Sequence, residues 1–420
     1  MYEGSRFHFF DCPDQDSDGR GPPLPPGCRI LGIAPSHGRI TLDGYFPSTW
    51  DRPGGTPWVD GYADSVWKGA AGHSHGQLEP DGLVAEMRGL EEALTGTLGD
   101  RGVINPRGGR RGGSVAHGEH LAVHLDNGAQ VLFHAGETET PTFRETRTEV
   151  RATVRVRTPH GLALGDIEHR YLDAVRELVV FCTRQPSYIQ RLTMSSPTWE
   201  DEVQVLRQPW PLSRRPLGRI RHLALNLGRI NEPRERVKRW FALREDVGAV
   251  WSLFFATLGQ EEGSLENRFL NLMAFTEGYH RARRDHPPLD KQQEKSARTA
   301  VLAALDREDR RARDVFVRSL SHANSQTQRD RLIELAAQAR DLLTWDFDPL
   351  ERCRSMVDTR NWMTHWGSRT RHVADDPASL SRFSRELELI LYVAILSDLE
   401  LDASEIAECV RKGRLREGLA

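Results

Sequence analysis

The chain has 420 residues, of which 38% are hydrophobic and 28% charged, and its formal net charge is −3. This composition excludes a collagen-like, a largely disordered and a disulfide-scaffold protein, and the length favours two or three domains. The small negative charge by itself argues against a dedicated nucleic-acid binder. However, residues 1–204 contain 28 acidic and 20 basic side chains, whereas residues 205–420 contain 32 and 37. The sequence therefore predicts two domains with different partners.

Cysteine usage and hydropathy indicate the compartment. The five cysteines are scattered and form no C-x-x-C pair, so neither a disulfide framework nor a zinc finger is expected. The first residues lack the apolar core of a signal peptide, and the longest uncharged apolar stretch, residues 247–259, is too short to span a bilayer. A cytoplasmic protein without membrane contact is expected.

Alternating apolar residues predict strands in the first half of the chain. Residues 38–46 and 150–157 place an apolar side chain at nearly every second position. Between them, residues 121–126 and 129–135 flank Asn127-Gly128, a strong signal for a two-residue hairpin turn. These patterns are typical of an antiparallel sandwich or barrel.

Helical spacing follows the strands. The apolar positions of residues 166–182 predict one helix attached to the sheet domain, and the three prolines of residues 207–219 are typical of a linker. Further along the chain, apolar residues recur with a period of 3.6 in segments that begin at Leu265, Leu332 and Leu380. We expect an all-α bundle of five to eight helices there.

The predicted fold is therefore α+β. A β-rich antiparallel N-terminal domain is expected over residues 1–206, a linker over residues 207–232, and an all-α helical domain over residues 233–416.

The candidate chemistry rests on an Arg-x4-His spacing. Because the chain contains 52 arginines and 16 histidines, this spacing also arises by chance, and its context has to decide. One pair lies across the end of a predicted strand and one across a helix end before a proline. Only the third lies in a continuous helical pattern. The three pairs are Arg155/His160, Arg281/His286 and Arg360/His365.

Helix geometry adds a condition to that third pair. Five residues advance about 7.5 Å along a helix and leave Arg360 and His365 about 140° apart around its axis. Asn361 and His365, at i and i+4, share a face. One helix therefore cannot close Arg360 and His365 around the same phosphate. Two copies of it across a two-fold axis can bring both residues to one groove, so a homodimer is expected.

These residue types suit RNA cleavage in which the substrate's own 2′-hydroxyl attacks without a metal. Histidine exchanges protons near neutral pH, so His365 is the candidate general acid and base. Arginine brings fixed positive charge and a planar donor fork to the phosphorane, which is the role assigned to Arg360. Asn361 is the candidate orienter. The alternative interpretation is that these side chains simply solvate one face of a bundle helix.

A family resemblance joins these motifs. Residues 357–366, with Arg360-Asn361 and Thr364-His365, resemble the R-N-x-x-T-H helix of the ApeA-like HEPN domain. Residues 268–281 resemble an earlier helix of that family, and residues 38–46 are similar to the opening of the ApeA N-terminal domain. The resemblance implies a cytoplasmic bacterial anti-phage protein whose HEPN domain is a metal-independent ribonuclease, with Arg360, Asn361 and His365 at the site.

The sequence also leads to predictions about metals, cofactors, partners and further substrate-binding residues. Glu277 is also explained by an ion pair with a neighbouring arginine, and His73-Ser-His75 lacks the additional ligands of a metal site. No cofactor or metal is expected. The expected partners are RNA, a second copy of the chain or a higher homo-oligomer, and a phage component as trigger. The alternative function is a non-catalytic RNA- or protein-binding module that uses the bundle for dimerisation. The additional substrate-binding candidates are Glu277, Arg354, Thr364, Trp366 and Arg369.

Overall fold

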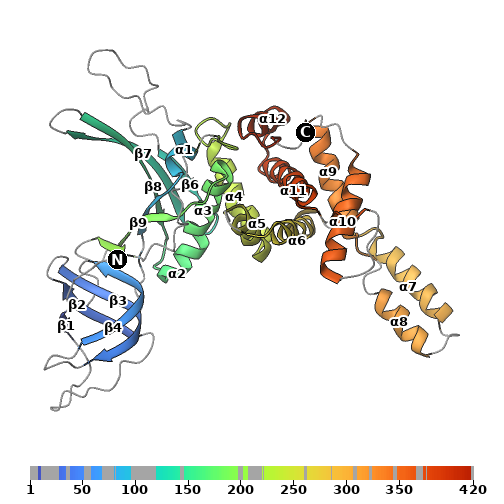
Figure 1. Cartoon of the computed structure of the whole chain (residues 1–420), viewed down its shortest axis with the longest axis horizontal. Helices are drawn as coiled ribbons and strands as arrows, with labels where there is room; N and C mark the ends of the chain where they lie inside the picture. The colour runs from blue at the N-terminus through green and yellow to red at the C-terminus, as the bar shows by residue number, and fades with distance from the viewer. Residues whose placement is uncertain are drawn as a thin grey trace. The chain divides into compact units, whose positions relative to one another are not determined.

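The computed structural model divides the chain into two compact units, residues 1–238 and 239–420 (Figure 1). The prediction of an α+β chain with an antiparallel sheet before a helical region is confirmed. The described residues are 8–10, 28–34, 38–51, 58–68, 80, 82–95, 120–141, 146–196, 202–206, 220, 222–259, 263–284, 286–305, 310–320, 324–343, 348–365, 372–374 and 376–417.

The first unit is built on one antiparallel sheet. Its ten described strands follow the order β1-β2-β3-β4-β10-β9-β5-β8-β7-β6. The sandwich or barrel expected from the sequence is replaced by a single sheet with β1 and β6 at its two ends. The reason is that β10 pairs with both β4 and β9 and so joins the early strands to the later ones. The strands are β1 (His8–Phe10), β2 (Cys28–Ala34), β3 (Gly38–Asp51), β4 (Trp58–Lys68), β5 (Gly82–Met87), β6 (His120–His124), β7 (Gln130–Pro141), β8 (Thr146–Arg157), β9 (Ile189–Ser195) and β10 (Val203–Leu206).

The predicted hairpin is confirmed, but its turn spans three residues and not two, because the Leu125 amide donates to the Ala129 carbonyl at 2.9 Å. β6 and β7 pair in antiparallel register, and the turn between them contains Gly128 at φ +82°, a conformation that glycine adopts without a steric cost. The amide of Ala129 donates to Asn127 Oδ1 at 3.1 Å, and Asn127 Nδ2 donates to the Tyr171 hydroxyl at 3.0 Å. The turn is thus fixed both locally and by a helix of the same unit.

Helices cover the apolar face of this sheet. The predicted helix at residues 166–182 is confirmed as a continuous run of α2 (Leu164–Ile167), the π turn η1 (Glu168–Leu172) and α3 (Asp173–Thr183). A short helix, α1 (Leu90–Thr95), contacts β7, β8 and α3. The buried side chains of the strands beneath include Leu83, Ala85, Val131, Phe133, Val154 and Val156.

The expected linker is only partly described, and its described part belongs to the first unit. Residues 207–219 lie outside the described residues. Further on, the amide of Ala224 donates to the Cys182 carbonyl at 2.8 Å, and that of Leu227 donates to the Ala93 carbonyl at 2.9 Å. Because the apolar side chains here are buried, this segment packs on the sheet domain. Along the chain, the boundary between the two units falls between residues 238 and 239.

The second unit is helical. Nine helices are described from residue 233 onward, more than the five to eight expected. Gly248, at φ +67°, separates the first two of them. The helices are α4 (Pro233–Val247), α5 (Ala249–Gly259), α6 (Leu265–Arg284), α7 (Lys291–Leu305), α8 (Arg310–Leu320), α9 (Gln328–Leu343), α10 (Pro349–His365), α11 (Pro377–Asp398) and α12 (Ala403–Lys412). The amphipathic helices expected from Leu265, Leu332 and Leu380 are confirmed as α6, α9 and α11.

An aromatic core holds this unit together around α11, whose central residues are almost all buried. Phe254 stacks on Phe275 with ring centroids 4.6 Å apart, and Trp240 meets Trp251 edge to face at 5.0 Å. Aromatic pairs at these distances add to the energy of burial itself. The core positions α6, α9 and α11 against one another, and α10 packs on α9 and α6.

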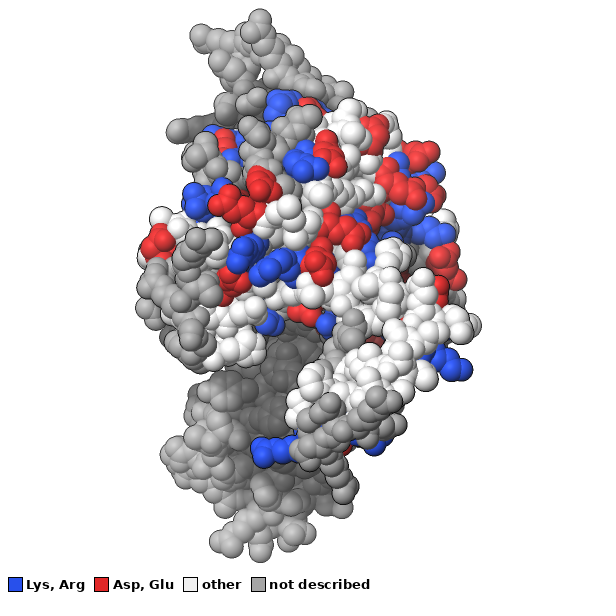
Figure 2. All heavy atoms as spheres, turned by 90° about the vertical axis from the view of Figure 1, so that its right-hand side faces the viewer, with Lys and Arg blue, Asp and Glu red and all other residues white. Residues whose placement is uncertain are grey.

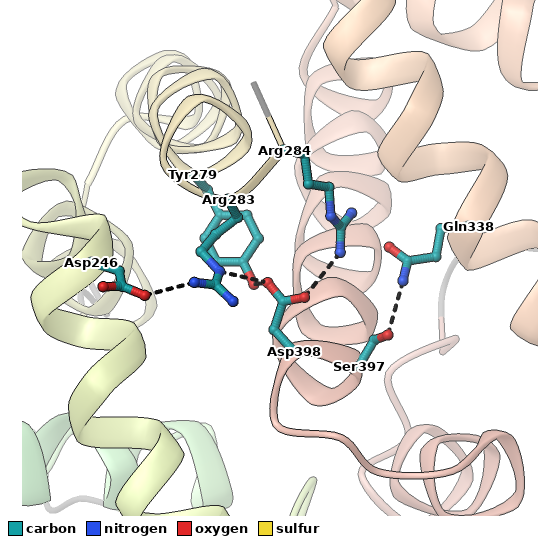
Figure 3. A network of polar contacts seen from close by, with 7 residues as sticks. All are labelled: Asp246, Tyr279, Arg283, Arg284, Gln338, Ser397 and Asp398. Atoms are coloured by element: carbon teal, nitrogen blue, oxygen red, sulfur yellow. Dashed lines mark hydrogen bonds and ion pairs between the residues drawn. The ribbon is translucent and has the colours of Figure 1, made fainter. Parts of the chain in front are cut away.

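A polar network fixes the end of α11 (Figure 3). The buried Tyr279 hydroxyl donates to Asp398 Oδ2 at 2.6 Å, and Arg284 Nη2 lies 3.3 Å from Asp398 Oδ1. Arg283 links the same carboxylate to Asp246, whose Oδ2 lies 2.6 Å from Arg283 Nη1. Burial and the adjacent carboxylate raise the pKa of Tyr279 well above its usual value, so this hydroxyl stays a donor. The network ties α4, α6 and α11 together.

No described helix of either unit has the length and hydropathy needed to cross a membrane.

Candidate active site

The three Arg-x4-His pairs lie in different kinds of structure. Arg155 lies in β8 and His160 beyond the end of that strand, while Arg281 lies in α6 and His286 beyond the end of that helix. Arg360 and His365 lie on one helix, α10, as the apolar pattern predicts. The third pair is therefore the candidate site.

The placement of α10 follows from its apolar residues. Cys353, Met356 and Val357 are buried, and burial raises the pKa of the Cys353 thiol to about 12. The thiol is thus a packing group and not a nucleophile at neutral pH. C-terminal to these buried residues on α10, Arg360 is half-buried, whereas Asn361 and His365 are exposed. None of the three occupies a core position.

The local hydrogen bonds hold the arginine and asparagine together. Arg360 Nη1 donates to Asn361 Oδ1 at 3.1 Å. The Thr364 hydroxyl donates to the Arg360 carbonyl at 2.9 Å and thereby satisfies a carbonyl in the last turn of the helix. His365 is the final residue of α10. A guanidinium has five N–H donors, so the Arg360–Asn361 bond leaves others for an anion.

Asp358 lies one helical turn before the site, and two arginines offset its negative charge. Arg354, Asp358, Asn361 and His365 are spaced so that they lie along one face of α10. Asp358 Oδ1 lies 3.2 Å from Arg329 Nη2 on α9, and its Oδ2 lies 3.9 Å from Arg354 Nε. These two guanidinium groups offset the repulsion that the carboxylate would exert on a phosphate. The substrate-binding candidate Arg354 is an exposed side chain, and its role in substrate binding stays a prediction.

Sequence reasoning missed Thr359, the residue just before the site. Its side chain is fully buried, and its hydroxyl donates to the Ser355 carbonyl at 2.7 Å while accepting from the Ala374 amide at 3.0 Å. The second bond ties residues 372–374 to the last turns of α10. The only sequence signal is that Thr359 continues the buried stripe of Met356. The candidates Trp366 and Arg369 lie outside the described residues.

Glu277 forms an ion pair with a neighbouring arginine, as the simpler interpretation of the sequence predicts. It lies on α6, and its Oε1 is 2.7 Å from Arg281 Nη2, one helical turn further on. This described ion pair is with a residue of α6 and not with Arg360 or His365.

Sequence reasoning also missed a buried histidine between α6 and α9. His280 Nε2 lies 2.9 Å from Glu334 Oε2, and its Nδ1 lies 3.4 Å from Arg331 Nη1. An arginine can only donate, so Nδ1 accepts, the ring is neutral and its proton sits on Nε2. Burial lowers the pKa of His280 and favours this neutral form. The residue supports the two helices on which α10 packs.

Among the residues that the structure describes, no three His, Cys, Asp or Glu side chains are grouped as metal ligands. His73 and His75 lie outside them.

The second unit is an all-α bundle in which the end of one helix, α10, carries Arg-x4-His. Residues 270–405, from within α6 to within α12, match the family model for the Apea-like HEPN domain. The second unit thus contains an Apea-like HEPN domain, and the match includes the whole of α10. No curated protein and no solved structure matches the chain.

HEPN domains are in general ribonucleases, so the match indicates an RNA-related nuclease or defence role in broad terms. It does not extend to the first unit, for which the resemblance to the ApeA N-terminal domain stays a prediction.

Proposed function

We propose that the chain is a metal-independent endoribonuclease of an anti-phage, abortive-infection type of defence. The observation that carries the proposal is the placement of Arg360, Asn361 and His365. Within the segment matched as HEPN, they lie together at the end of α10, outside the core, while the other Arg-x4-His pair of that segment does not share one helix.

The reaction is a transesterification of RNA. A neutral imidazole of His365 removes the proton of the 2′-hydroxyl, and the 2′-oxygen attacks the adjacent phosphorus. The bond to the 5′-oxygen then breaks, and that oxygen receives a proton from a second, protonated imidazole. The products are a 2′,3′-cyclic phosphate and a 5′-hydroxyl.

Arg360 stabilises the negative charge that the phosphorus oxygens gain in the transition state. Its bond to Asn361 Oδ1 restricts the guanidinium fork, so that less side-chain freedom is lost when phosphate binds. Asn361 is the orienter, and Thr364 is bonded to the Arg360 carbonyl as a part of the same turn.

The mechanism proposed here uses one imidazole as base and a second as acid, whereas α10 carries one histidine at its end. A homodimer in which the second copy supplies the second His365 meets this need. It also lets Arg360 of one copy face His365 of the other, although the two residues lie about 140° apart on one helix. We place the protein in the cytoplasm, where RNA is its substrate, and assign the first unit to sensing a phage component.

The direct test compares purified wild type, Arg360→Ala and His365→Ala on a labelled RNA. His286→Ala is the matched control, because His286 is an exposed histidine of an Arg-x4-His pair that lies outside α10. We expect both α10 variants to lose cleavage by roughly 100-fold or more and the control to stay at wild-type rate. Product ends are read by resistance to phosphatase until the cyclic phosphate is opened by acid.

Three outcomes contradict the proposal. Cleavage by His365→Ala at the wild-type rate removes the catalytic role of this residue. Loss of wild-type cleavage in EDTA, restored by a divalent cation, removes the metal-independent mechanism. Binding without cleavage, even with phage components added, establishes the non-catalytic module instead. In cells, phage protection and growth arrest should disappear together in Arg360→Ala.

A further inference from the structure

The α7–α8 hairpin carries most of the positive charge excess of the second half of the chain. Residues 291–320 contain eight basic and five acidic side chains, a net of +3, whereas residues 205–420 contain 37 and 32, a net of +5. The described acidic side chains of the two helices are Glu294 and Asp314, so a negatively charged partner is favoured. Six of the eight basic side chains are described and exposed: Lys291, Lys295, Arg298, Arg311, Arg313 and Arg318.

On α8, cationic side chains flank an exposed apolar strip. Val315 is 57% exposed and Phe316 is 54% exposed, although large apolar side chains are usually buried. Arg311 and Arg318 each lie one helical turn from Val315 and share its face of the helix. Arg313 lies one turn before Phe316 in the same way. The helix therefore presents an aromatic ring and guanidinium groups together.

α7 adds a row of cations to the hairpin. Lys291, Lys295 and Arg298 are spaced by four and three residues, so they share one face of the helix. The carboxylate of α7, Glu294, is instead bonded at the base of the hairpin, where its Oε2 lies 3.0 Å from Asn324 Nδ2. Asn324 also accepts from the Leu289 amide and donates to the Leu289 carbonyl. These bonds give the hairpin a defined position on the bundle.

The hairpin adjoins the candidate site. α8 leads into α9, and Arg329 Nη2 in the first turn of α9 lies 3.2 Å from Asp358 Oδ1 on α10. Asn361 and His365 follow Asp358 on the same helix face. The hairpin therefore joins the bundle beside the half of α10 that carries the site.

Elsewhere on the second unit, basic side chains lie beside carboxylates. Arg340 Nη2 is 2.8 Å from Asp341 Oδ1, and Glu408 lies 2.5 Å from Arg411 and 2.7 Å from Lys412. Figure 2 shows acidic and basic side chains interleaved over the upper part of the described surface. The lower part, where α7 and α8 lie in Figure 1, is white and blue with little red. The hairpin is thus more suitable for an anion than the surface above it.

A single RNA strand offers the groups that this surface fits. Its phosphates are anions for guanidinium and ammonium groups, and its unpaired bases stack on aromatic rings. An acidic lipid surface fits less well, because an interfacial helix buries a broad apolar face. Among its described residues, α8 exposes only two large apolar side chains.

We propose that the α7–α8 hairpin is a binding surface for single-stranded RNA that holds the substrate outside the candidate site. The guanidinium groups of Arg311 and Arg318 contact phosphates, and one base stacks on Phe316. Because the hairpin joins the bundle beside α10, RNA held there continues toward His365. The inference rests on the proposed function for RNA as the substrate, but binding tests it separately from cleavage.

The experiment measures RNA binding by the full chain in a His365→Ala background. A labelled single strand of about 20 nucleotides is followed by fluorescence anisotropy at several salt concentrations. Arg311→Gln combined with Arg318→Gln should weaken binding roughly 10-fold or more. The slope of log K against log salt should become shallower by about 1.4, the value for two lost contacts to single-stranded phosphates.

The aromatic ring is tested by Phe316→Leu, which keeps an apolar side chain but removes the stacking face. Binding should weaken roughly 5- to 150-fold with an unchanged salt slope, whereas Phe316→Trp should bind like wild type. The charge control combines Arg411→Gln with Lys412→Gln, two exposed cations of α12. The apolar control is Leu350→Ala, because Leu350 is a 63% exposed leucine of α10. Both controls should leave RNA binding unchanged.

Three results overturn the inference. The first is wild-type affinity and salt slope in the α8 double variant, and the second is an equal loss in the α12 control. The third is a Phe316-dependent binding to vesicles of phosphatidylcholine and phosphatidylserine with no binding to RNA, which assigns the surface to lipid. If the α8 double variant loses helix content by circular dichroism, Lys295→Gln combined with Arg298→Gln on α7 decides by the same two readouts.

The two proposals fail in different ways. A chain that binds RNA through the hairpin but does not cleave it with His365 present supports the hairpin inference and removes the ribonuclease. A chain that cleaves RNA while the α8 variants change neither binding nor KM removes the hairpin inference alone.

Discussion

The Thr359 hydroxyl accepts a hydrogen bond from the Ala374 amide at 3.0 Å and so ties the chain that follows α10 to the turn that carries the candidate site. The same hydroxyl donates to the Ser355 carbonyl at 2.7 Å. Because the side chain is fully buried, neither bond is replaced by water when the hydroxyl is removed.

Thr359→Val should lower both stability and turnover. The Ala374 amide loses its acceptor, which costs about 1–3 kcal/mol in a urea unfolding experiment. Because the position of Arg360 then varies, we expect kcat to fall more than KM changes. Thr359→Ser retains the hydroxyl and should restore kcat. If Thr359→Val is destabilised but the folded fraction cleaves RNA at the wild-type rate, the residue is purely structural.

Arg360→Lys tests whether the planar fork matters beyond its charge. Lysine keeps the positive charge but cannot reproduce the fork or its restrained bond to Asn361. We expect single-turnover cleavage to fall by roughly 10- to 100-fold. Arg281→Lys is the control, because Arg281 pairs with Glu277 on α6. Full activity of Arg360→Lys would show that only the positive charge at this position matters for cleavage.

His280 predicts a pH dependence of stability with a defined sign. Its pKa in the folded protein lies below the ordinary value of 6.5, so the unfolded chain binds more protons between these two values. The free energy of unfolding should therefore decrease as the pH falls below about 6.5 and level off below the folded pKa. Urea titrations from pH 7.5 to 5 measure this slope.

His280→Gln isolates that effect. A glutamine amide can donate to Glu334 and accept from Arg331, as the neutral imidazole does, but it does not titrate. The slope near pH 6 should become shallower, while the fall at lower pH remains. That lower fall is expected because a hydrogen bond donated at this position helps to hold the pKa of Glu334 below its usual value, and the glutamine amide retains that bond. An unchanged slope near pH 6 would assign it to other groups.

Asp398→Asn tests the network of Figure 3. The neutral side chain removes the Asp398 carboxylate from Arg284 and Arg283, of which Arg283 keeps its ion pair with Asp246, while one oxygen remains for the Tyr279 hydroxyl. We expect the free energy of unfolding to fall by about 1–3 kcal/mol. Ser397→Ala removes a single bond from Gln338 and should cost about 1 kcal/mol. Equal losses for the two variants would show that the charges add nothing.

Local patterns were sufficient for much of the fold. The Asn127-Gly128 turn needs a positive φ that few residues adopt, so its sequence predicts it directly. The helices α6, α9 and α11 each bury one face, and the 3.6-residue period of their apolar side chains shows that face in the sequence. Long-range pairing has no such signature. The bridging role of β10 and the packing of residues 222–227 on the first unit depend on partners far away in the chain.

The sequence by itself determined that Arg360, Asn361 and His365 share one helix and cannot all face the same point, because helical periodicity is a local property. Only the tertiary structure decided which helices cover the apolar side of α10, namely α9 and α6. It also decided that Asp358 is matched by Arg329 of α9, and that Thr359 anchors residues 372–374. Each of these contacts joins residues whose separation along the chain gives no periodic signal, and only the packed fold brings their polar atoms within bonding distance.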